Sequence, residues 1–190
     1  MELSRELFVA LIALVAALRV VELRISRRNQ RRLAQRGATR ASDPRFPAMV
    51  VLHTCVLAGA AAEVVFLRRP FYALLAAVMG ALFLASNALR WWVIRTLGAH
   101  WNVQVMDSAR LGVVSAGPYR WVRHPNYSAV FVEMFSLPLI HTAWITALAG
   151  SLAHVWVLRG RVAAEEKVLL AEPEYRAAMG SKPRFVPFLF

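Results

Sequence analysis

The most unusual run of this sequence extends from Gly117 to Tyr127 and reads GPYRWVRHPNY. Arginine and histidine can bind a carboxylate, and aromatic rings can face a cation. A second polar set, Arg161, Glu165 and Glu166, follows the last apolar part of the chain and adds carboxylates that can bind an ammonium group. Taken singly, the first run is explained by an aromatic belt at a membrane surface, and the second by an exposed helical ion pair. Taken together, the two sets could bind a ligand that carries both charges.

The apolar composition indicates which elements must position these residues. Hydrophobic residues make up 58% of the chain, above the usual fraction for a soluble domain, and the mean hydropathy is +0.48. Three runs are long enough to cross a bilayer as helices: Leu7–Leu23, Ala48–Leu67 and Phe71–Ile94. A fourth run, Ser128–Leu158, is interrupted at Pro138 and is expected to form a hairpin of two short helices, with tilted or incomplete crossing. The predicted fold class is therefore all-α: a polytopic transmembrane bundle of about five helices, the last two forming the hairpin.

The positive charge is distributed in a way that favours a membrane protein over a nucleic-acid-binding one. The formal net charge is +12, and the arginines cluster between the apolar runs, most densely from Arg24 to Arg45. Because short loops rich in arginine and lysine stay in the cytoplasm, this loop, residues 95–127 and the tail from residue 159 are expected inside, with the N-terminus outside. The basic loop is expected to contact anionic lipid headgroups. The preference for arginine over lysine suggests a bacterial genome of high GC content, and the expected location is the bacterial inner membrane, with the active site facing the cytoplasm.

The hairpin determines where the two polar sets lie. Its arms return the chain to the same membrane surface, so His124–Tyr127 and Arg161–Glu165 are expected to meet at one cytoplasmic mouth. His154 lies two turns before Arg161 on nearly the same helix face. A single domain of residues 1–190 is the simplest organisation, with membrane helices in 1–97 and the cofactor-binding and catalytic region in 98–190.

The ordered motifs of the C-terminal half resemble the isoprenylcysteine carboxyl methyltransferase (ICMT)-like family of integral membrane methyltransferases. An Arg-His-Pro-x-Tyr signature is followed, at a separation similar to the family's, by an Arg-x-x-x-Glu-Glu pattern. A lone Arg-His-Pro would be a weak signal, whereas the series is specific. It consists of Gln104, Gly117, Tyr119, Arg123–Tyr127, Arg161, Glu165, Glu166, Tyr175 and Arg184–Phe188.

This resemblance implies methyl transfer from S-adenosylmethionine, leaving S-adenosylhomocysteine. Arg161 and Glu165 would be the catalytic pair, with Arg161 facing the methyl acceptor. No glycine-rich Rossmann fingerprint is present, and the histidines lack metal-ligand spacing, so no metal is expected. The side chains of residues 111–114 depart from the family pattern and are expected to contribute backbone or apolar contacts. The residues implied to hold the cofactor are Gln104, Leu111, Gly112, Val113, Val114, Tyr119, Arg123, His124, Pro125, Asn126, Tyr127 and Glu165.

The expected acceptor is an amphiphile that enters laterally from the lipid. A carboxylate, as in an isoprenylcysteine, would arrive ionised and need only Arg161, whereas a phenol or enol hydroxyl would also need a proton acceptor such as His100, His124 or Glu165. The run His100–Gln104 is similar to that of bacterial relatives that methylate alkylresorcinols or alkylpyrones, which favours a hydroxyl. Two rival classes are an NADPH-dependent membrane reductase of the related sterol and steroid reductase superfamily, and a non-enzymatic membrane adaptor.

Charged residues inside apolar runs are costly unless they face the bundle interior or reach water. Glu133 follows Tyr127 by about one and a half turns and is expected to line the acceptor's entrance between helices. Most of the others lie close enough to the ends of spans that their side chains are expected to snorkel to the surface. They are Arg19, Glu22, Glu63, Asn87 and Arg90.

Overall fold

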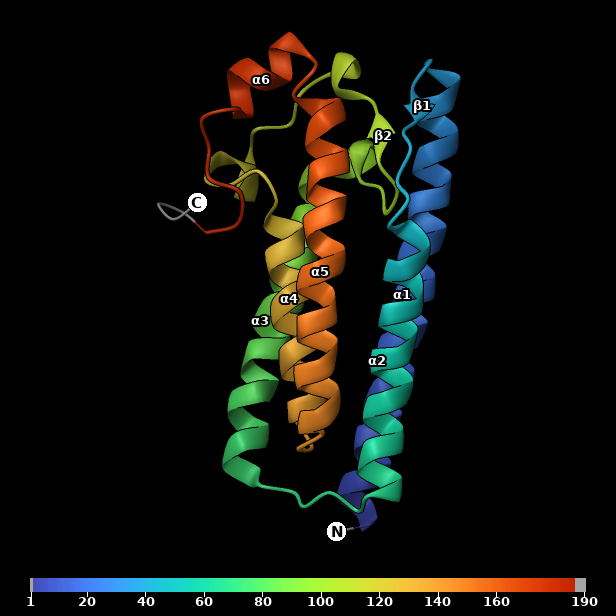
Figure 1. The fold of residues 1–190 in the computed structure, drawn as a ribbon, viewed down its shortest axis with the longest axis vertical. Coiled ribbons are helices and arrows are strands. Elements are labelled where there is room, and N and C mark those ends of the chain that lie inside the picture. The colour runs from blue at the N-terminus through green and yellow to red at the C-terminus, as the bar shows by residue number, and fades with distance from the viewer. Residues whose placement is uncertain (1, 187–190) are drawn as a thin grey trace.

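The computed structural model describes residues 2–186, which fold as a helical bundle (Figure 1). Helices α1 and α2 run side by side, and α3, α4 and α5 pack beside them, while α6 and the irregular segments gather at one end. The predicted helical class is confirmed, and α4 and α5 form the expected hairpin. The α-helices of the described residues are α1 (Glu2–Gln35), α2 (Phe46–Phe66), α3 (Ala73–Leu97), α4 (Pro125–Leu139), α5 (Trp144–Leu169) and α6 (Pro173–Met179).

Helix α1 is longer than the sequence pattern predicts. The arginine-rich stretch after Leu23 was expected to be a loop, but it continues as helix to Gln35, and the backbone turns only at Gly37, where φ is +87°. Arginine and glutamine are good helix formers, and no proline or glycine interrupts them. The buried face of this extension carries Ser26, Asn29 and Leu33. The exposed arginines therefore project from a helix that also forms part of the protein interior.

The irregular segment after α3 is held against this extension of α1. The side-chain amide of Asn29 donates hydrogen bonds to the carbonyl oxygens of Gly98 and Trp101, at 2.9 and 2.8 Å, and the Val103 N–H donates to Ser26 Oγ at 3.0 Å. A two-residue antiparallel ladder, which was not predicted, joins β1 (Thr39–Arg40) to β2 (Met106–Asp107). These contacts fix the position of residues 98–107.

Two stretches of the described residues are long and apolar enough to cross a membrane, namely 46–66 and 73–100. Their outer surfaces carry exposed apolar side chains, including Phe66 and Leu74, each 81% exposed. Helix α1 has charged residues among its apolar ones, and α4, with 15 residues, is only about 22 Å long. A five-pass arrangement stays a prediction.

The charged residues of the apolar runs are paired inside the bundle, so the prediction that they snorkel is wrong for this group. Glu22 accepts hydrogen bonds from Arg90, with Nη2 at 2.6 Å, and from Arg19, with Nη1 at 2.8 Å. Arg19 also lies 3.2 Å from Glu133. Glu22, Arg90 and Glu133 are buried, and Arg19 is partly buried. Two arginines and two glutamates give this cluster no net charge, which lowers the cost of burying it.

Glu63 connects α2 to the start of the hairpin's second helix. Its carboxylate accepts hydrogen bonds from the backbone N–H groups of Ile145 and Thr146 at 3.1 and 2.8 Å, and it pairs with Arg69 at 2.8 Å. The first N–H groups of a helix have no partner within the helix, and a carboxylate there also complements the helix dipole. Glu63 thus fixes the first turn of α5 against α2.

We expect Glu22→Gln to destabilise the protein strongly, because it leaves the cluster with an uncompensated buried positive charge. The loss should be roughly 3 kcal/mol, as when one partner of a buried ion pair is removed. Thermal unfolding in detergent measures it, with Glu6→Gln on the exposed face of α1 as the matched control. Equal unfolding midpoints for the two variants would show that the cluster contributes nothing to stability.

Candidate functional site

A cavity of about 610 Å³ extends from the irregular segments beside α6 into the helical bundle. It is lined by residues of all six α-helices and of the segment that connects α3 to α4. Most of the residues predicted to bind a cofactor or acceptor are brought together in its wall. These are Gln104, Gly112, Val113, Val114, Tyr119, Arg123, His124, Asn126, Tyr127, Arg161 and Glu165.

Three of the predicted residues do not line the cavity. Leu111 packs against the small apolar cluster around Leu33 and Met106. Pro125 is fully buried in the first turn of α4, where a proline is well tolerated because its missing N–H would have no helical partner. Glu133, expected at the acceptor's entrance, instead pairs with Arg19 in the buried cluster.

Arg161 is held by contacts from three parts of the chain. Its Nη1 lies 2.5 Å from Asp43 Oδ2, and its Nη2 donates to the carbonyl oxygen of Val103 at 2.8 Å. Its guanidinium carbon also lies 5.9 Å from the centre of the Phe46 ring, within cation–π range. Asp43 was not predicted from the sequence, because it lies 118 residues before Arg161 in an arginine-rich loop. The charge of Arg161 is therefore already compensated within the protein.

The two polar sets of the sequence meet at Glu165. The Tyr127 hydroxyl donates to Glu165 Oε2 at 2.7 Å, and His124 Nδ1 lies 3.9 Å from the same oxygen. The Glu165 side chain keeps 27% of its surface exposed, so it can still accept hydrogen bonds from a ligand in the cavity. The convergence expected from the hairpin is thus present in the structure.

The adjacent glutamate, Glu166, faces away from the cavity and joins the 123–127 turn to the C-terminal tail. Its carboxylate accepts hydrogen bonds from His124 Nε2 at 3.1 Å and from Arg184 Nη2 at 2.7 Å, and it lies 3.5 Å from Arg123 Nη1. The backbone N–H of His124 donates to the Arg184 carbonyl oxygen at 2.8 Å. Of the tail residues that carry the family resemblance, Pro187 and Phe188 lie outside the described residues.

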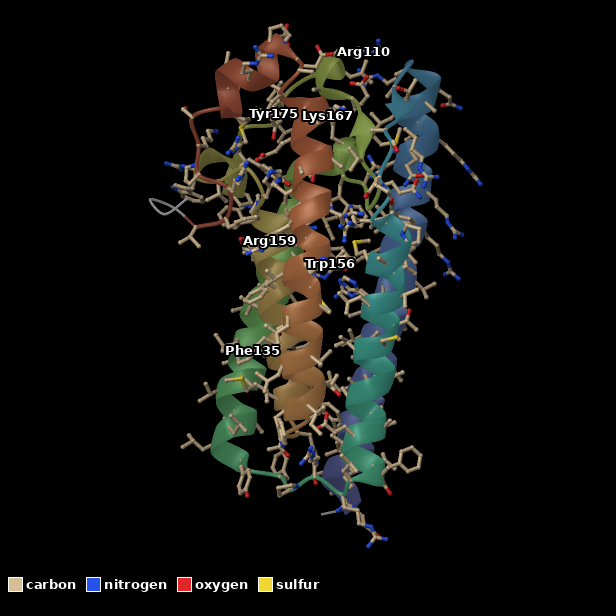
Figure 2. The ribbon with its side chains drawn as sticks, in the orientation of Figure 1. Arg110, Phe135, Trp156, Arg159, Lys167 and Tyr175 are labelled. Carbon is tan, nitrogen blue, oxygen red and sulfur yellow. The ribbon has the colours of Figure 1, made fainter. Side chains whose placement is uncertain are left out.

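An aromatic wall closes the cavity beside Glu165. Tyr119 and Tyr175 are buried in one apolar cluster with Trp101, and Val113 packs against it. Figure 2 shows Tyr175 at the end of the bundle that carries α6. Burial, reinforced by the negative charge of Glu165, raises the pKa of both tyrosine hydroxyls, so both are neutral at pH 7.

The groups facing the cavity suit a ligand with an ammonium, a carboxylate and an aromatic ring. Glu165 can accept from the ammonium, and the aromatic wall can pack against the ring. Two buried polar atoms near the turn, Arg123 Nε and Asn126 Oδ1, have no hydrogen-bond partner within the protein. Since buried polar groups are normally paired, these atoms fit the polar end of such a ligand.

Comparison with known proteins identifies the family. Residues 77–171, half of the chain, match the isoprenylcysteine carboxyl methyltransferase (ICMT) family. The chain belongs to the ICMT family. Membership of this integral membrane family implies a methyltransferase, and the matched residues include the 123–127 turn, Arg161 and Glu165.

Two bacterial proteins and one solved structure are similar to this ICMT-family chain. The Bacillus subtilis protein YpbQ, described as uncharacterized, is 28% identical over 163 residues, which cover 86% of this chain and 96% of YpbQ. An uncharacterized protein of Haemophilus influenzae is 26% identical over 158 residues, covering 83% and 91% of the two chains. The eukaryotic intramembrane Ras methyltransferase ICMT shares the fold, with a TM-score of 0.56 and 23% identity. That match covers 75% of this chain and only 53% of the larger eukaryotic one.

We expect the Glu166 carboxyl to titrate far below its usual range. The hydrogen bond from His124 and the contacts with Arg184 and Arg123 lower its pKa from 4.5 to about 2. Because the folded-state pKa is the lower one, Glu166 stabilises the folded state fully above pH 4.5, and this contribution is lost as the pH falls through 2. NMR of protein labelled at the glutamate carboxyl carbons measures the midpoint, and Glu166→Gln assigns the signal. A midpoint near 4.5 would contradict the described contacts.

Proposed function

We propose that this protein is an S-adenosylmethionine-dependent O-methyltransferase that acts on an amphiphilic acceptor taken from the bilayer. The observation that carries the proposal is a single cavity with two chemically different ends. One end is polar and holds Glu165, Tyr127 and His124 beneath the irregular segments. The other end is lined mainly by apolar side chains of α1 and α2, such as Ile12 and Leu57, beside the paired charges of Arg19, Glu22 and Arg90.

The polar end supplies what S-adenosylmethionine requires. When bound, this cofactor supplies an electrophilic methyl group on a cationic sulfur, and S-adenosylmethionine is the methyl donor of the family's members. Glu165 and the amide oxygen of Asn126 would accept hydrogen bonds from its ammonium group, and Arg123 would bind its carboxylate. The ring of Tyr127 would face the sulfonium, while Val113 and Tyr119 would pack against the adenosine. Gly112 and Val114 also line the cavity beside them.

The apolar end supports lateral entry of the acceptor. Among the residues that line the cavity, Val20 and Leu23 of α1 and Val50 of α2 keep between 36% and 47% of their surface accessible. We infer that the cavity opens toward the lipid beside these helices, so that a long-chain amphiphile could enter with its chain still in the membrane. Positioning and dehydration of the nucleophilic oxygen beside the methyl group would then provide most of the catalysis.

Arg161 would position the oxygen that accepts the methyl group. A guanidinium group can bind either an acceptor carboxylate or an acceptor hydroxyl. A carboxylate, however, would have to compete for Arg161 with Asp43, whose Oδ2 lies 2.5 Å from Arg161 Nη1. An uncharged hydroxyl can accept a hydrogen bond from Arg161 without displacing Asp43. The structure therefore favours the hydroxyl, whose proton would pass to His124 or Glu165.

Two measurements test the proposal. Calorimetry on purified protein should show binding of S-adenosylhomocysteine and no binding of NADPH. Incubation with radiolabelled S-adenosylmethionine and a bacterial lipid extract should label an extractable product, with a base-stable ether from a hydroxyl and a base-labile ester from a carboxylate. Binding of NADPH in place of S-adenosylhomocysteine would instead indicate a reductase.

We expect Glu165→Gln to weaken the binding of S-adenosylhomocysteine by about tenfold or more. The substitution keeps the size of the side chain but removes the charge that would hold the ligand's ammonium group, and a hydrogen bond to a charged group contributes about 1.5–3 kcal/mol. Calorimetric titration measures the affinity. Glu174→Gln, on the exposed surface of α6, is the matched control and should bind as the unmodified protein does. Equal affinities for the two variants would remove Glu165 from the cofactor site.

A further inference from the structure

The Tyr127 hydroxyl group lies between the two side chains that the proposed function places at the acceptor oxygen and at the cofactor. It donates a hydrogen bond to Glu165 Oε2 at 2.7 Å, and the Arg161 side chain also interacts with it. All three side chains line the cavity, Tyr127 from the first turn of α4 and the other two from α5. An acceptor oxygen held by Arg161 would therefore lie beside the Tyr127 oxygen.

Arg161 can hold an acceptor hydroxyl but cannot take its proton. Its Nη1 contacts Asp43 Oδ2 and its Nη2 donates to the Val103 carbonyl oxygen, whereas its buried Nε has no hydrogen-bond partner among the described residues. Nε is thus the donor that remains for the acceptor oxygen. A guanidinium group has no acceptor atom and stays protonated in proteins. The hydroxyl proton must therefore leave through a different neighbour of the acceptor oxygen.

Tyr127 can be that neighbour because a phenol hydroxyl both donates and accepts hydrogen bonds. Its own proton is already directed at Glu165, which leaves the lone pairs of its oxygen to accept. If this oxygen takes up one proton while it gives the other to Glu165, Tyr127 is uncharged before and after the step. Glu165 needs no direct contact with the acceptor in this arrangement, so its carboxylate stays available to the cofactor's ammonium group.

The alternative proton acceptor, His124, is less suitably placed. Its Nε2 lies 3.1 Å from Glu166 Oε1 and its Nδ1 lies 3.9 Å from Glu165 Oε2, so both ring nitrogens face carboxylates. A proton on His124 would add a cation next to Glu166, which Arg123 and Arg184 already contact. A proton on Glu165 instead neutralises an anion as the cationic sulfur becomes a neutral thioether, so no new charge forms in the cavity. Since uncompensated buried charge is costly, the structure favours Glu165.

We infer that Tyr127 is a catalytic residue that relays the acceptor's hydroxyl proton to Glu165 while the methyl group is transferred. The inference rests on the proposed function and assigns the proton path at the same site. The acceptor oxygen forms its bond to the methyl carbon as the carbon–sulfur bond breaks, with the electron pair left on sulfur. The acceptor proton moves to the Tyr127 oxygen, and the Tyr127 proton moves to Glu165 Oε2. Glu165, with 27% of its side chain exposed, then returns the proton to water.

Acceptors of different acidity test the relay in Tyr127→Phe, which keeps the ring and removes the hydroxyl. With 4-dodecylphenol, which is largely protonated at about pH 8, kcat for methyl transfer from radiolabelled S-adenosylmethionine should fall about 100-fold, as when a general base is lost. With 4-dodecyl-2-nitrophenol, whose nitro group makes the hydroxyl acidic enough to be ionised at this pH, kcat should be nearly unchanged, because no proton has to be removed. Tyr72→Phe, at an exposed tyrosine outside the cavity, is the matched control and should use both acceptors as the unmodified protein does.

Binding without cofactor provides a second readout. The hydroxyl of 4-dodecylphenol should donate to the Tyr127 oxygen, which its methyl ether, 4-dodecylanisole, cannot do. The phenol should therefore raise the thermal unfolding midpoint of the unmodified protein more than the ether does, and this difference should disappear in Tyr127→Phe. S-adenosylhomocysteine should bind Tyr127→Phe and the unmodified protein equally, which also shows that the variant is folded.

Several results would overturn the relay and leave the proposed function standing. An equal loss of kcat with both phenols in Tyr127→Phe would indicate a positioning role, and an unchanged kcat with 4-dodecylphenol would indicate no role. A phenol preference that persists in Tyr127→Phe without cofactor would show that the hydroxyl does not meet the Tyr127 oxygen. No transfer to 4-dodecylphenol by the unmodified protein would also exclude the relay. Absence of S-adenosylhomocysteine binding in the unmodified protein would overturn both the relay and the proposed function.

Discussion

A bundle with an apolar exterior can bury charged side chains only when each is paired, and this constraint organises the molecule. Arg90 is paired with Glu22 in the middle of the bundle, and Arg161 is paired with Asp43 below the irregular segments. Each pair joins parts of the chain that are distant in sequence. The Arg161–Asp43 contact, with the Val103 carbonyl oxygen, brings the loop before α2 and the segment after α3 against α5, and so encloses the polar end of the cavity.

Most of the helical framework could be predicted because hydropathy depends on local sequence alone. The runs that became α2 and α3, and the break at Pro138 within the hairpin, were visible in composition. The end of α1 was not predicted. Helix propensity favours continuation of the helix through the arginines, and its buried face at Ser26 and Asn29 forms only when residues 98–103 pack against it. The β1–β2 ladder escaped prediction for the same reason: it is two residues long and depends on tertiary contacts.

The site was predictable where the hairpin alone determines its geometry. Tyr127 and Glu165 lie on the two arms of one turn, so their contact follows from topology. Asp43 lies far away in sequence, and nothing in its spacing distinguishes it from an ordinary loop carboxylate. The pairing of Glu133 was missed because its distance from Tyr127 suggests the cavity, whereas its actual orientation depends on Arg19 in another helix.

Under the proposed function, one cofactor lies between the two arms of the hairpin and one amphiphile lies below it. An experimental structure in lipid nanodiscs with bound S-adenosylhomocysteine tests this placement most directly. It should show the ligand's ammonium group within hydrogen-bond distance of the Glu165 carboxylate, its carboxylate at Arg123, and the sulfur facing Arg161, with the Arg161–Asp43 pair intact. A ligand bound elsewhere on the protein, or a cavity filled by lipid while S-adenosylhomocysteine is saturating, would contradict the account.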